Sequence, residues 1–173
     1  MLFADIDNDG EGELITASDT IVILESTGLF EWEVAAELPN VGRVGGGAVI
    51  DVVRVADVDG DGLNEIIASG NSGAVTVYKH TYSESTKRST YPVVWQSRPL
   101  VSAELGPMPD RGDGPRSPWA FTQGLAVGDV DGDGAIEIVV ATAQFGQRSG
   151  AEPGNNGQIH VFEHTATRWF ERR

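Results

Sequence analysis

The sequence contains no cysteine in its 173 residues, which excludes disulfides, thiolate metal sites and cysteine nucleophiles. It also has no apolar run that approaches the roughly 20 residues of a membrane-spanning helix. Basic residues are scarce, because 12 Lys and Arg face 26 Asp and Glu and leave a formal net charge of -14. Nucleic acid is therefore not an expected partner, since a polyanion would meet a negative surface. The 40% of apolar residues are sufficient for the core of one domain.

Most of the negative charge lies in three short motifs. Nine of the 13 Asp occupy "DIDNDG" at 5–10 and "DVDGDG" at 57–62 and 129–134. A Glu follows three residues after the last Gly of each motif, at Glu13, Glu65 and Glu137. Without these twelve carboxylates, 14 acidic residues would face 12 basic ones, and the net charge would be -2. The chain therefore has three acidic loops, which we call loop 1 (5–13), loop 2 (57–65) and loop 3 (129–137), and no generally acidic surface.

The spacing D-x-D-x-D-G-x-x-E is typical of a calcium-binding loop. In a short winding loop the side chains of positions 1, 3 and 5 can converge on one point, and calcium prefers about six to eight oxygen ligands. Glycine at position 6 permits a sharp turn. The varied residue at position 7 can offer its carbonyl oxygen, and the Glu at position 9 closes the cage. Magnesium prefers a smaller octahedral shell rich in water, so calcium is the favoured ion.

Two other interpretations of the motif are disfavoured. An EF-hand needs a bidentate Glu at position 12 and helices on both sides, whereas position 12 here is Thr16, Ala68 or Val140. The following runs, such as "EIIASG" and "EIVVATA", are rich in β-branched residues and predict strands. A simple turn also favours Asp and Gly, but three matches followed by the same apolar pattern argue against chance.

An internal repeat surrounds the three loops. Each copy has the order strand, acidic loop, strand, Gly-rich turn, strand, and a fourth strand carries a tryptophan, Trp32, Trp95 or Trp169. Four consecutive antiparallel strands are the unit of a β-propeller blade. We predict an all-β chain with blade 1 at about 1–38, blade 2 at about 46–98, a long loop at about 99–120 and blade 3 at about 121–173. The predicted packing between blades uses the three tryptophans and Leu14, Ile15, Val22, Ile66, Ile67, Val75, Val77, Ile138, Val139, Ile159 and Val161.

The third copy, "VGDVDGDGAIEIVVATA" followed by "FGQRSGAEPGNNG" and "QIHVFEH", resembles the FG-GAP repeat of the integrin α-subunit propeller and the related VCBS-type repeats. The resemblance implies a calcium loop between the first and second strands of each blade and about three calcium ions. The chain departs from the family in having Glu where Asp is usual at position 9. The implied ligands are Asp5, Asp7, Asp9, Glu11 and Glu13; Asp57, Asp59, Asp61, Leu63 and Glu65; and Asp129, Asp131, Asp133, Ala135 and Glu137, where position 7 contributes its carbonyl oxygen.

Three blades are fewer than the about four to eight of closed propellers. An open arc would leave blade faces and a sheet edge uncovered. We therefore expect the remaining blades to come from a longer polypeptide, which is the favoured interpretation, or from self-assembly of this chain. The abrupt start at the first acidic motif also favours a fragment, so a missing signal segment says little about destination.

The long connections predict a ligand-binding face opposite the acidic loops. The segment Ser97–Thr122 holds five of the eight prolines and is not expected to form regular sheet, and a long turn is expected at Gln144–Gly157. Variable loops on a rigid scaffold are common binding surfaces. An Arg-Gly-Asp tripeptide begins at Arg111, although ordinary loop packing also accounts for these residues. The candidates on this face are Arg111, Asp113, Arg116, Trp119 and Phe121.

No catalytic constellation is visible. The three histidines, His80, His160 and His164, are expected at or near strand ends in contact with solvent, without metal or triad spacing. We expect a non-enzymatic, calcium-stabilised scaffold for binding or adhesion to a protein or glycan, in an extracellular, cell-surface or periplasmic location. The alternatives are a non-catalytic propeller of a secreted carbohydrate-active enzyme, a lectin, and a purely architectural subunit.

Overall fold

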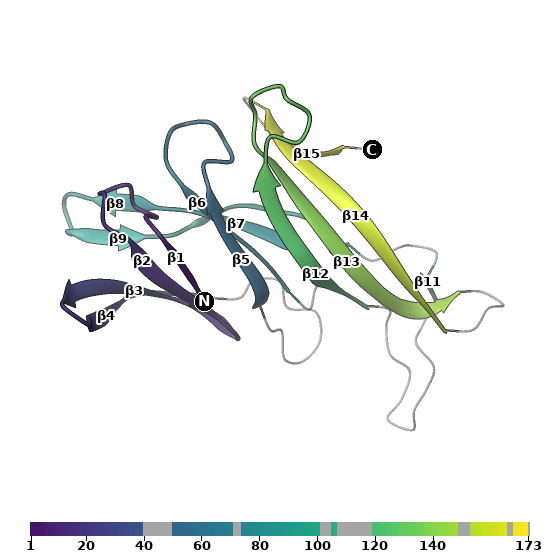
Figure 1. Cartoon of the computed structure of the whole chain (residues 1–173), viewed down its shortest axis with the longest axis horizontal. Helices are drawn as coiled ribbons and strands as arrows, with labels where there is room; N and C mark the ends of the chain where they lie inside the picture. The colour runs from purple at the N-terminus through teal and green to yellow at the C-terminus, as the bar shows by residue number, and fades with distance from the viewer. Residues whose placement is uncertain are drawn as a thin grey trace.

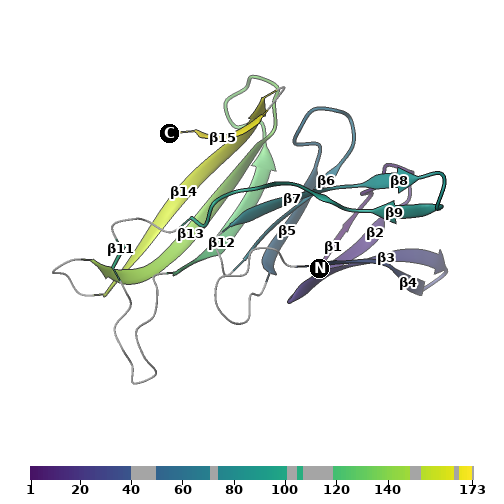
Figure 2. The same ribbon diagram turned by 180° about the vertical axis from the view of Figure 1, so that it is seen from behind.

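The fold is all-β, as the sequence predicts. The computed structural model describes residues 1–39, 50–70, 74–100, 105–106, 119–148, 153–165 and 168–172. These residues form antiparallel strands and no helix, and hence no helix able to cross a membrane. Figure 1 shows three main sheets side by side in chain order, and Figure 2 shows the same arrangement from behind.

Each main sheet contains four consecutive blade strands, with a tryptophan on the fourth. Trp32, Trp95 and Trp169 lie on β4, β10 and β15. Blade 1 contains β1 (Leu2–Ala4), β2 (Glu13–Ala17), β3 (Thr20–Gly28) and β4 (Glu31–Pro39). Blade 2 contains β5 (Ile50–Ala56), β6 (Glu65–Gly70), β7 (Val75–Lys79) and β10 (Val93–Gln96). Blade 3 contains β12 (Trp119–Gly128), β13 (Glu137–Arg148), β14 (Pro153–Thr165) and β15 (Arg168–Arg172).

Two local features differ from the sequence prediction. The stretch Gln144–Gly157 is not a long turn, because β13 and β14 stay paired from Gln144 opposite Asn156 to Gln147 opposite Pro153. Its glycines and asparagines are compatible with a ladder because the backbone supplies the hydrogen bonds. The segment Ser97–Thr122 is also not wholly irregular, because β11 (Leu105–Gly106) pairs with the end of β13 and β12 begins at Trp119.

A small hairpin that sequence reasoning missed interrupts blade 2. It consists of β8 (Thr81–Ser83) and β9 (Arg88–Thr90), and it lies between β7 and β10 along the chain. The hairpin does not change the order of the blade, since β10 still pairs with β7. It adds to the length of chain between loop 2 and loop 3.

The core lies between the blades. In β6, Ile66 and Ala68 pack towards blade 1, while Ile67 packs in the cluster shared with blade 3. Successive strand residues point to opposite faces, so a strand covered on both faces is buried at every position. All six residues of β6 are buried. The cluster between blades 1 and 2 includes Ile6, Ile15, Ile21, Ile23, Leu38, Val53, Tyr78 and Tyr91, and the cluster between blades 2 and 3 includes Val58, Val75, Val77, Leu100, Leu125, Ile138, Val140 and Phe162.

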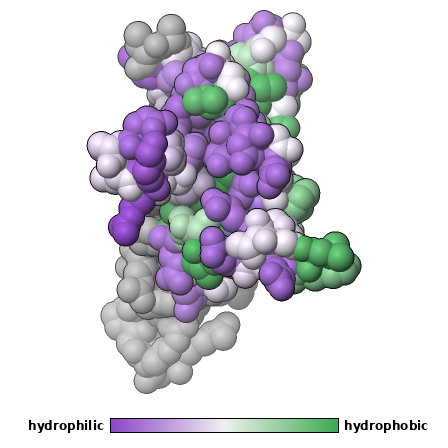
Figure 3. Space-filling view, turned by 90° about the vertical axis from the view of Figure 1, so that its left-hand side faces the viewer, coloured by the Kyte–Doolittle hydropathy of each residue, from purple (hydrophilic) through white to green (hydrophobic). Residues whose placement is uncertain are grey.

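Two predicted core residues are exposed on outer faces of the array, and four more, Leu14, Val22, Val139 and Val161, are half-buried and lie outside both clusters. Ile159 is 73% exposed on blade 3, and Trp32 is 41% exposed on blade 1. Ile159 alternates with buried His160, whereas Trp32 lies among exposed residues of β4. No blade among the described residues covers either side chain. Figure 3 looks onto the blade 1 side and shows apolar patches among hydrophilic residues. The prediction of blade packing is thus wrong for these six side chains and right for Trp95, which stacks on Trp169 across the blade 2 and blade 3 interface.

Candidate metal centre

The three acidic loops occupy equivalent places in the three blades. Loop 1 connects β1 to β2, loop 2 connects β5 to β6, and loop 3 connects β12 to β13. The ladders on either side hold the loop ends, since Ala4 pairs with Glu13, Ala56 with Glu65 and Gly128 with Glu137. The predicted position of the motif between the first and second strands of a blade is confirmed.

A shared set of hydrogen bonds shapes each loop. The amide at position 6 donates to the position 1 carboxylate over 2.8 to 3.0 Å, in Gly10 to Asp5, Gly62 to Asp57 and Gly134 to Asp129. The amide at position 7 donates to the position 5 carboxylate over 2.7 to 3.0 Å, in Glu11 to Asp9, Leu63 to Asp61 and Ala135 to Asp133. The glycines at position 6 have φ between 89° and 93°, a left-handed conformation in which a Cβ is strained. The predicted turn is thus confirmed.

The glutamates at position 9 fold back into their loops. Each accepts a hydrogen bond from the amide at position 2: Ile6 to Glu13 at 2.8 Å, Val58 to Glu65 at 3.0 Å and Val130 to Glu137 at 2.8 Å. These three side chains belong to residues that are at most 4% exposed. A buried carboxylate is costly unless it is paired or bound to a metal. The arrangement therefore directs a nearly water-free carboxylate towards the loop centre.

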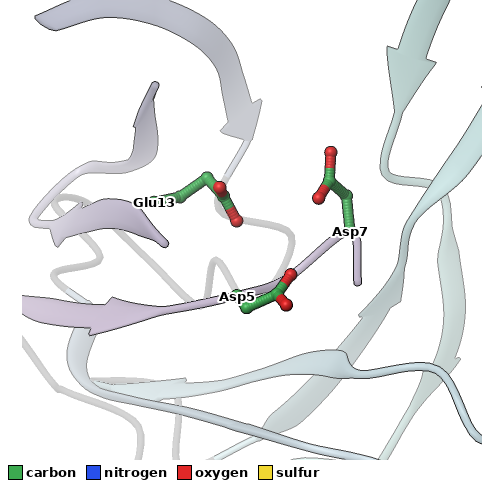
Figure 4. A group of neighbouring side chains, drawn as sticks. All are labelled: Asp5, Asp7 and Glu13. Carbon is green, nitrogen blue, oxygen red and sulfur yellow. The ribbon is translucent and has the colours of Figure 1, made fainter. Parts of the chain in front are cut away.

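Carboxylate oxygens converge in every loop. Oxygens that lie within 4.8 Å of one another come from Asp5, Asp7 and Glu13 in loop 1, from Asp57, Asp59 and Asp61 in loop 2, and from Asp129, Asp131 and Glu137 in loop 3. Figure 4 shows the loop 1 group, with Glu13 reaching over from the start of β2. The predicted ligands Asp9, Glu65 and Asp133 lie outside these close groups but in the same loops.

One buried oxygen in each loop lacks a hydrogen-bond partner. These atoms are Asp5 Oδ1, Glu65 Oε1 and Glu137 Oε1, of which Glu65 Oε1 has an ion-pair partner, since it lies 3.1 Å from Lys79 Nζ. Leaving such a group unsatisfied costs about 1 to 3 kcal/mol, and more for a charged one. A cation at the loop centre would supply the missing partner, so these residues fit a hard metal ion held by oxygen ligands.

The electrostatics of loop 1 also favour a bound cation. The pKa of Glu13 is raised to about 7, chiefly by burial and further by the charges of Asp7, Asp9 and Asp5. The hydrogen bond from the Ile6 amide acts in the opposite direction and lowers it. The pKa of the neighbouring Glu25 is likewise raised by burial and by Asp7. Both shifts mean that ionising these carboxyl groups beside loop 1 costs free energy, and a divalent cation would offset that cost.

Loops 2 and 3 have basic side chains beside them. In loop 2, Lys79 Nζ lies 2.6 Å from both Asp59 Oδ2 and Asp61 Oδ2, and 3.1 Å from Glu65 Oε1. In loop 3, the Arg172 guanidinium contacts Asp131 and Glu163 and lies 3.5 Å from Asp133. The Asp131 side chain is 36% exposed, and the hydrogen bond from Arg172 lowers its pKa. Sequence analysis did not identify either basic residue as a neighbour of its acidic loop. Lys79 lies on β7, the third strand of blade 2, and Arg172 lies on β15, the fourth strand of blade 3.

Two asparagines tie loop 1 to loop 2. Asn64 Nδ2 donates to the Asp5 carbonyl at 2.8 Å, and the Asn64 amide donates to Asn8 Oδ1 at 3.0 Å. Asn8 has φ of 61°, a left-handed conformation that asparagine tolerates better than most residues. Loops 1 and 2 are therefore connected across a sequence distance of 56 residues.

Replacing Asn64 by Ala should lower the free energy of unfolding by about 1 kcal/mol, because the Asp5 carbonyl loses its side-chain donor. Urea unfolding monitored by circular dichroism measures this loss. The Asn8→Gly variant keeps the left-handed turn and should cost a similar amount. If the two asparagines act as one connection, the double variant loses less than the two single losses added together. Additive losses would contradict a shared connection.

The ligand-face candidates are placed only in part. Arg111, Asp113 and Arg116 lie outside the described residues, and Trp119 and Phe121 are described only as backbone positions on β12. A cavity of about 360 Å³ lies elsewhere, between blades 2 and 3. It is lined by Asp59, Glu65, Val77, Val94, Trp95, His164, Arg168 and Trp169.

The expectation of solvated histidines is wrong for His160. This side chain is buried on β14, and its Nδ1 lies 2.6 Å from Glu171 Oε1. Although burial opposes it, the hydrogen bond from His160 lowers the pKa of Glu171. Glu171 also pairs with Arg98, so these charges connect the end of blade 2 to blade 3. His160 follows the exposed Ile159 on β14, and adjacent strand residues point to opposite faces of the sheet. This alternation is the signal that could have placed His160 on the buried face.

The fold and the loops together define a chain built from blades of the β-propeller type. Residues 121–162 match the family model of the FG-GAP repeat. This segment spans most of β12, loop 3, β13 and most of β14, so blade 3 is an FG-GAP repeat. The match identifies the repeat and does not single out the integrin α-subunit. No curated protein and no solved structure matches the chain.

Proposed function

We propose that this protein is a calcium-stabilised propeller scaffold whose metals are structural. The observation that carries the proposal is the convergence of carboxylate oxygens in each acidic loop, with a buried, unpartnered oxygen on Asp5 in loop 1 and on Glu137 in loop 3. The amide network holds those carboxylates in place before any ion arrives, so binding requires little rearrangement. Oxygen-only ligands in such a loop suit calcium better than magnesium, which requires a near-octahedral shell. The bound ions would fix the connections between the first two strands of each blade.

The biological role that fits such a scaffold is binding or adhesion outside the cytosol. Calcium loops of extracellular modules bind with dissociation constants of about 0.1 to 1 mM, which suits the millimolar calcium outside cells. Loops at the end of the blades opposite the metal sites would contact the partner. Its class stays open between a protein and a glycan.

Calorimetric titration of chelator-treated protein tests the metal proposal. We expect saturable calcium binding with a dissociation constant on the order of 0.1 mM and much weaker binding of magnesium. Glu137→Gln should remove one ion from the count, because it removes the buried charge of loop 3. Glu84→Gln is the matched control, since Glu84 is 79% exposed on the β8–β9 hairpin. Absence of calcium binding, or equal binding of both metals, would refute the proposal.

A further inference from the structure

The three acidic loops differ in the residue that faces them from the third strand of their blade. In blade 2, the β6 to β7 ladder places Lys79 directly opposite Glu65, the position 9 residue. In blade 1, Leu14 pairs with Leu24, so the next position along the ladder sets Glu25 against Glu13. In blade 3, Ile138 pairs with Phe162, so Glu163 is set against Glu137 in the same way. Two loops therefore face an additional carboxylate, and loop 2 faces an ammonium.

Lys79 reaches the centre of loop 2. Its Nζ contacts three of the four loop carboxylates, those of Asp59, Asp61 and Glu65. An ammonium has three protons, so these contacts use its full donor capacity. The side chain is only 18% exposed, and the ladder fixes the Cα from which it extends. Burial opposes the charge of Lys79, but the hydrogen bonds that its ammonium donates to the three carboxylates outweigh it and hold its pKa above the usual range.

The basic residue near loop 3 has a different position. Arg172 contacts Asp131, Asp133 and Glu163, and no contact joins it to Glu137. Glu137 remains fully buried with Oε1 unpartnered. In loop 2, the corresponding atom, Glu65 Oε1, lies 3.1 Å from the ammonium of Lys79. Loop 3 thus keeps an open ligand position, whereas Lys79 occupies that position in loop 2.

We infer that Lys79 is the resident cation of loop 2, so that the protein binds calcium at loops 1 and 3 and only weakly at loop 2. The inference rests on the proposed function, because it concerns which of the loops receive calcium. A divalent ion entering loop 2 must share its carboxylates with a positive charge or displace it, and like charges at such distances repel. Loop 2 would then keep its shape at calcium concentrations that leave loops 1 and 3 empty.

Counting ions by native mass spectrometry across a calcium series tests this inference on the whole chain. We expect two ions on the wild type and three on Lys79→Met, which keeps an unbranched apolar stem and removes the charge. Lys87→Met is the matched control, because Lys87 is 70% exposed on the β8–β9 hairpin and the same charge is lost. It should still bind two ions. Circular dichroism in calcium verifies folding, and Lys79→Gln, which keeps a donor for Glu65, serves if the methionine variant does not fold.

Each outcome has a distinct meaning. Three ions of similar affinity on the wild type would overturn the role of Lys79 and leave the calcium proposal intact. Two ions on both the wild type and the Lys79 variants would also overturn it, since loop 2 would then reject calcium for another reason. No ions on any variant would instead refute the proposed function. A third site at least about tenfold tighter in Lys79→Met than in the wild type would support the inference.

Discussion

Calcium at about 1 mM is expected to raise the unfolding temperature by about 10 °C over that in excess chelator. With a dissociation constant of about 0.1 mM, each occupied loop contributes about 1.4 kcal/mol, so two or three ions contribute about 3 to 4 kcal/mol. A chain of this length gains about 2 to 4 °C for each kcal/mol. The physical reason is the buried carboxylates, which lack partners when no cation is bound.

Differential scanning calorimetry in calcium, in magnesium and in chelator measures this effect. Magnesium at the same concentration should give only a small part of the rise, because it keeps its water shell more firmly. The Glu137→Gln variant should show a smaller calcium response than the wild type, since one of its cages is incomplete. An unfolding temperature that is indifferent to chelator would mean that the three loops are turns without an ion.

Replacing Trp95 by Ala is expected to lower the free energy of unfolding by about 3 kcal/mol. Trp95 stacks on Trp169 with ring centroids 4.9 Å apart, and it meets the edge of Phe162 at 5.2 Å. Such aromatic pairs add about 0.5 to 1.5 kcal/mol beyond the apolar area that they bury. Because Trp95 belongs to blade 2 and both partners belong to blade 3, the substitution opens the interface between two blades.

The matched control is Trp32→Ala, the same change on the fourth strand of blade 1. Trp32 is 41% exposed, and its ring contact in the described part of the chain is with Phe3 at 6.3 Å. Urea unfolding in saturating calcium should show a loss below about 1 kcal/mol for this variant. Equal losses for the two substitutions would contradict the assignment of Trp95 to an interface between blades.

The acidic motifs could be located in the fold from the sequence because their information is local. The spacing of Asp5, Asp7 and Asp9, the glycine at position 6 and the β-branched run after Glu13 lie within a dozen residues. Loop geometry depends on these neighbours, so the same hydrogen bonds recur in all three copies. Local periodicity likewise indicated the four strands of each blade, and the tryptophan marked the last of them.

Tertiary structure decided the features that depend on distant residues. The position of Lys79 in loop 2 follows from the register between β6 and β7, and a shift of one residue would turn its side chain to the other face. The link from Asn64 to loop 1 follows from the packing of blade 1 on blade 2. Neither the pairing register nor the neighbouring blade can be read from a nine-residue motif.

The sequence by itself determined the all-β class, the four-strand repeat and the placement of twelve carboxylates in three loops. These follow from the alternation of strands and from the turn chemistry of Asp and Gly, both of which act over a few residues. Only the tertiary structure decided which apolar faces are covered, and this difference separates Trp95 from Trp32. It also decided which basic side chain lies beside loop 2 and which lies beside loop 3. Those outcomes depend on contacts between strands and between blades, because burial and charge pairing are properties of the assembled sheets.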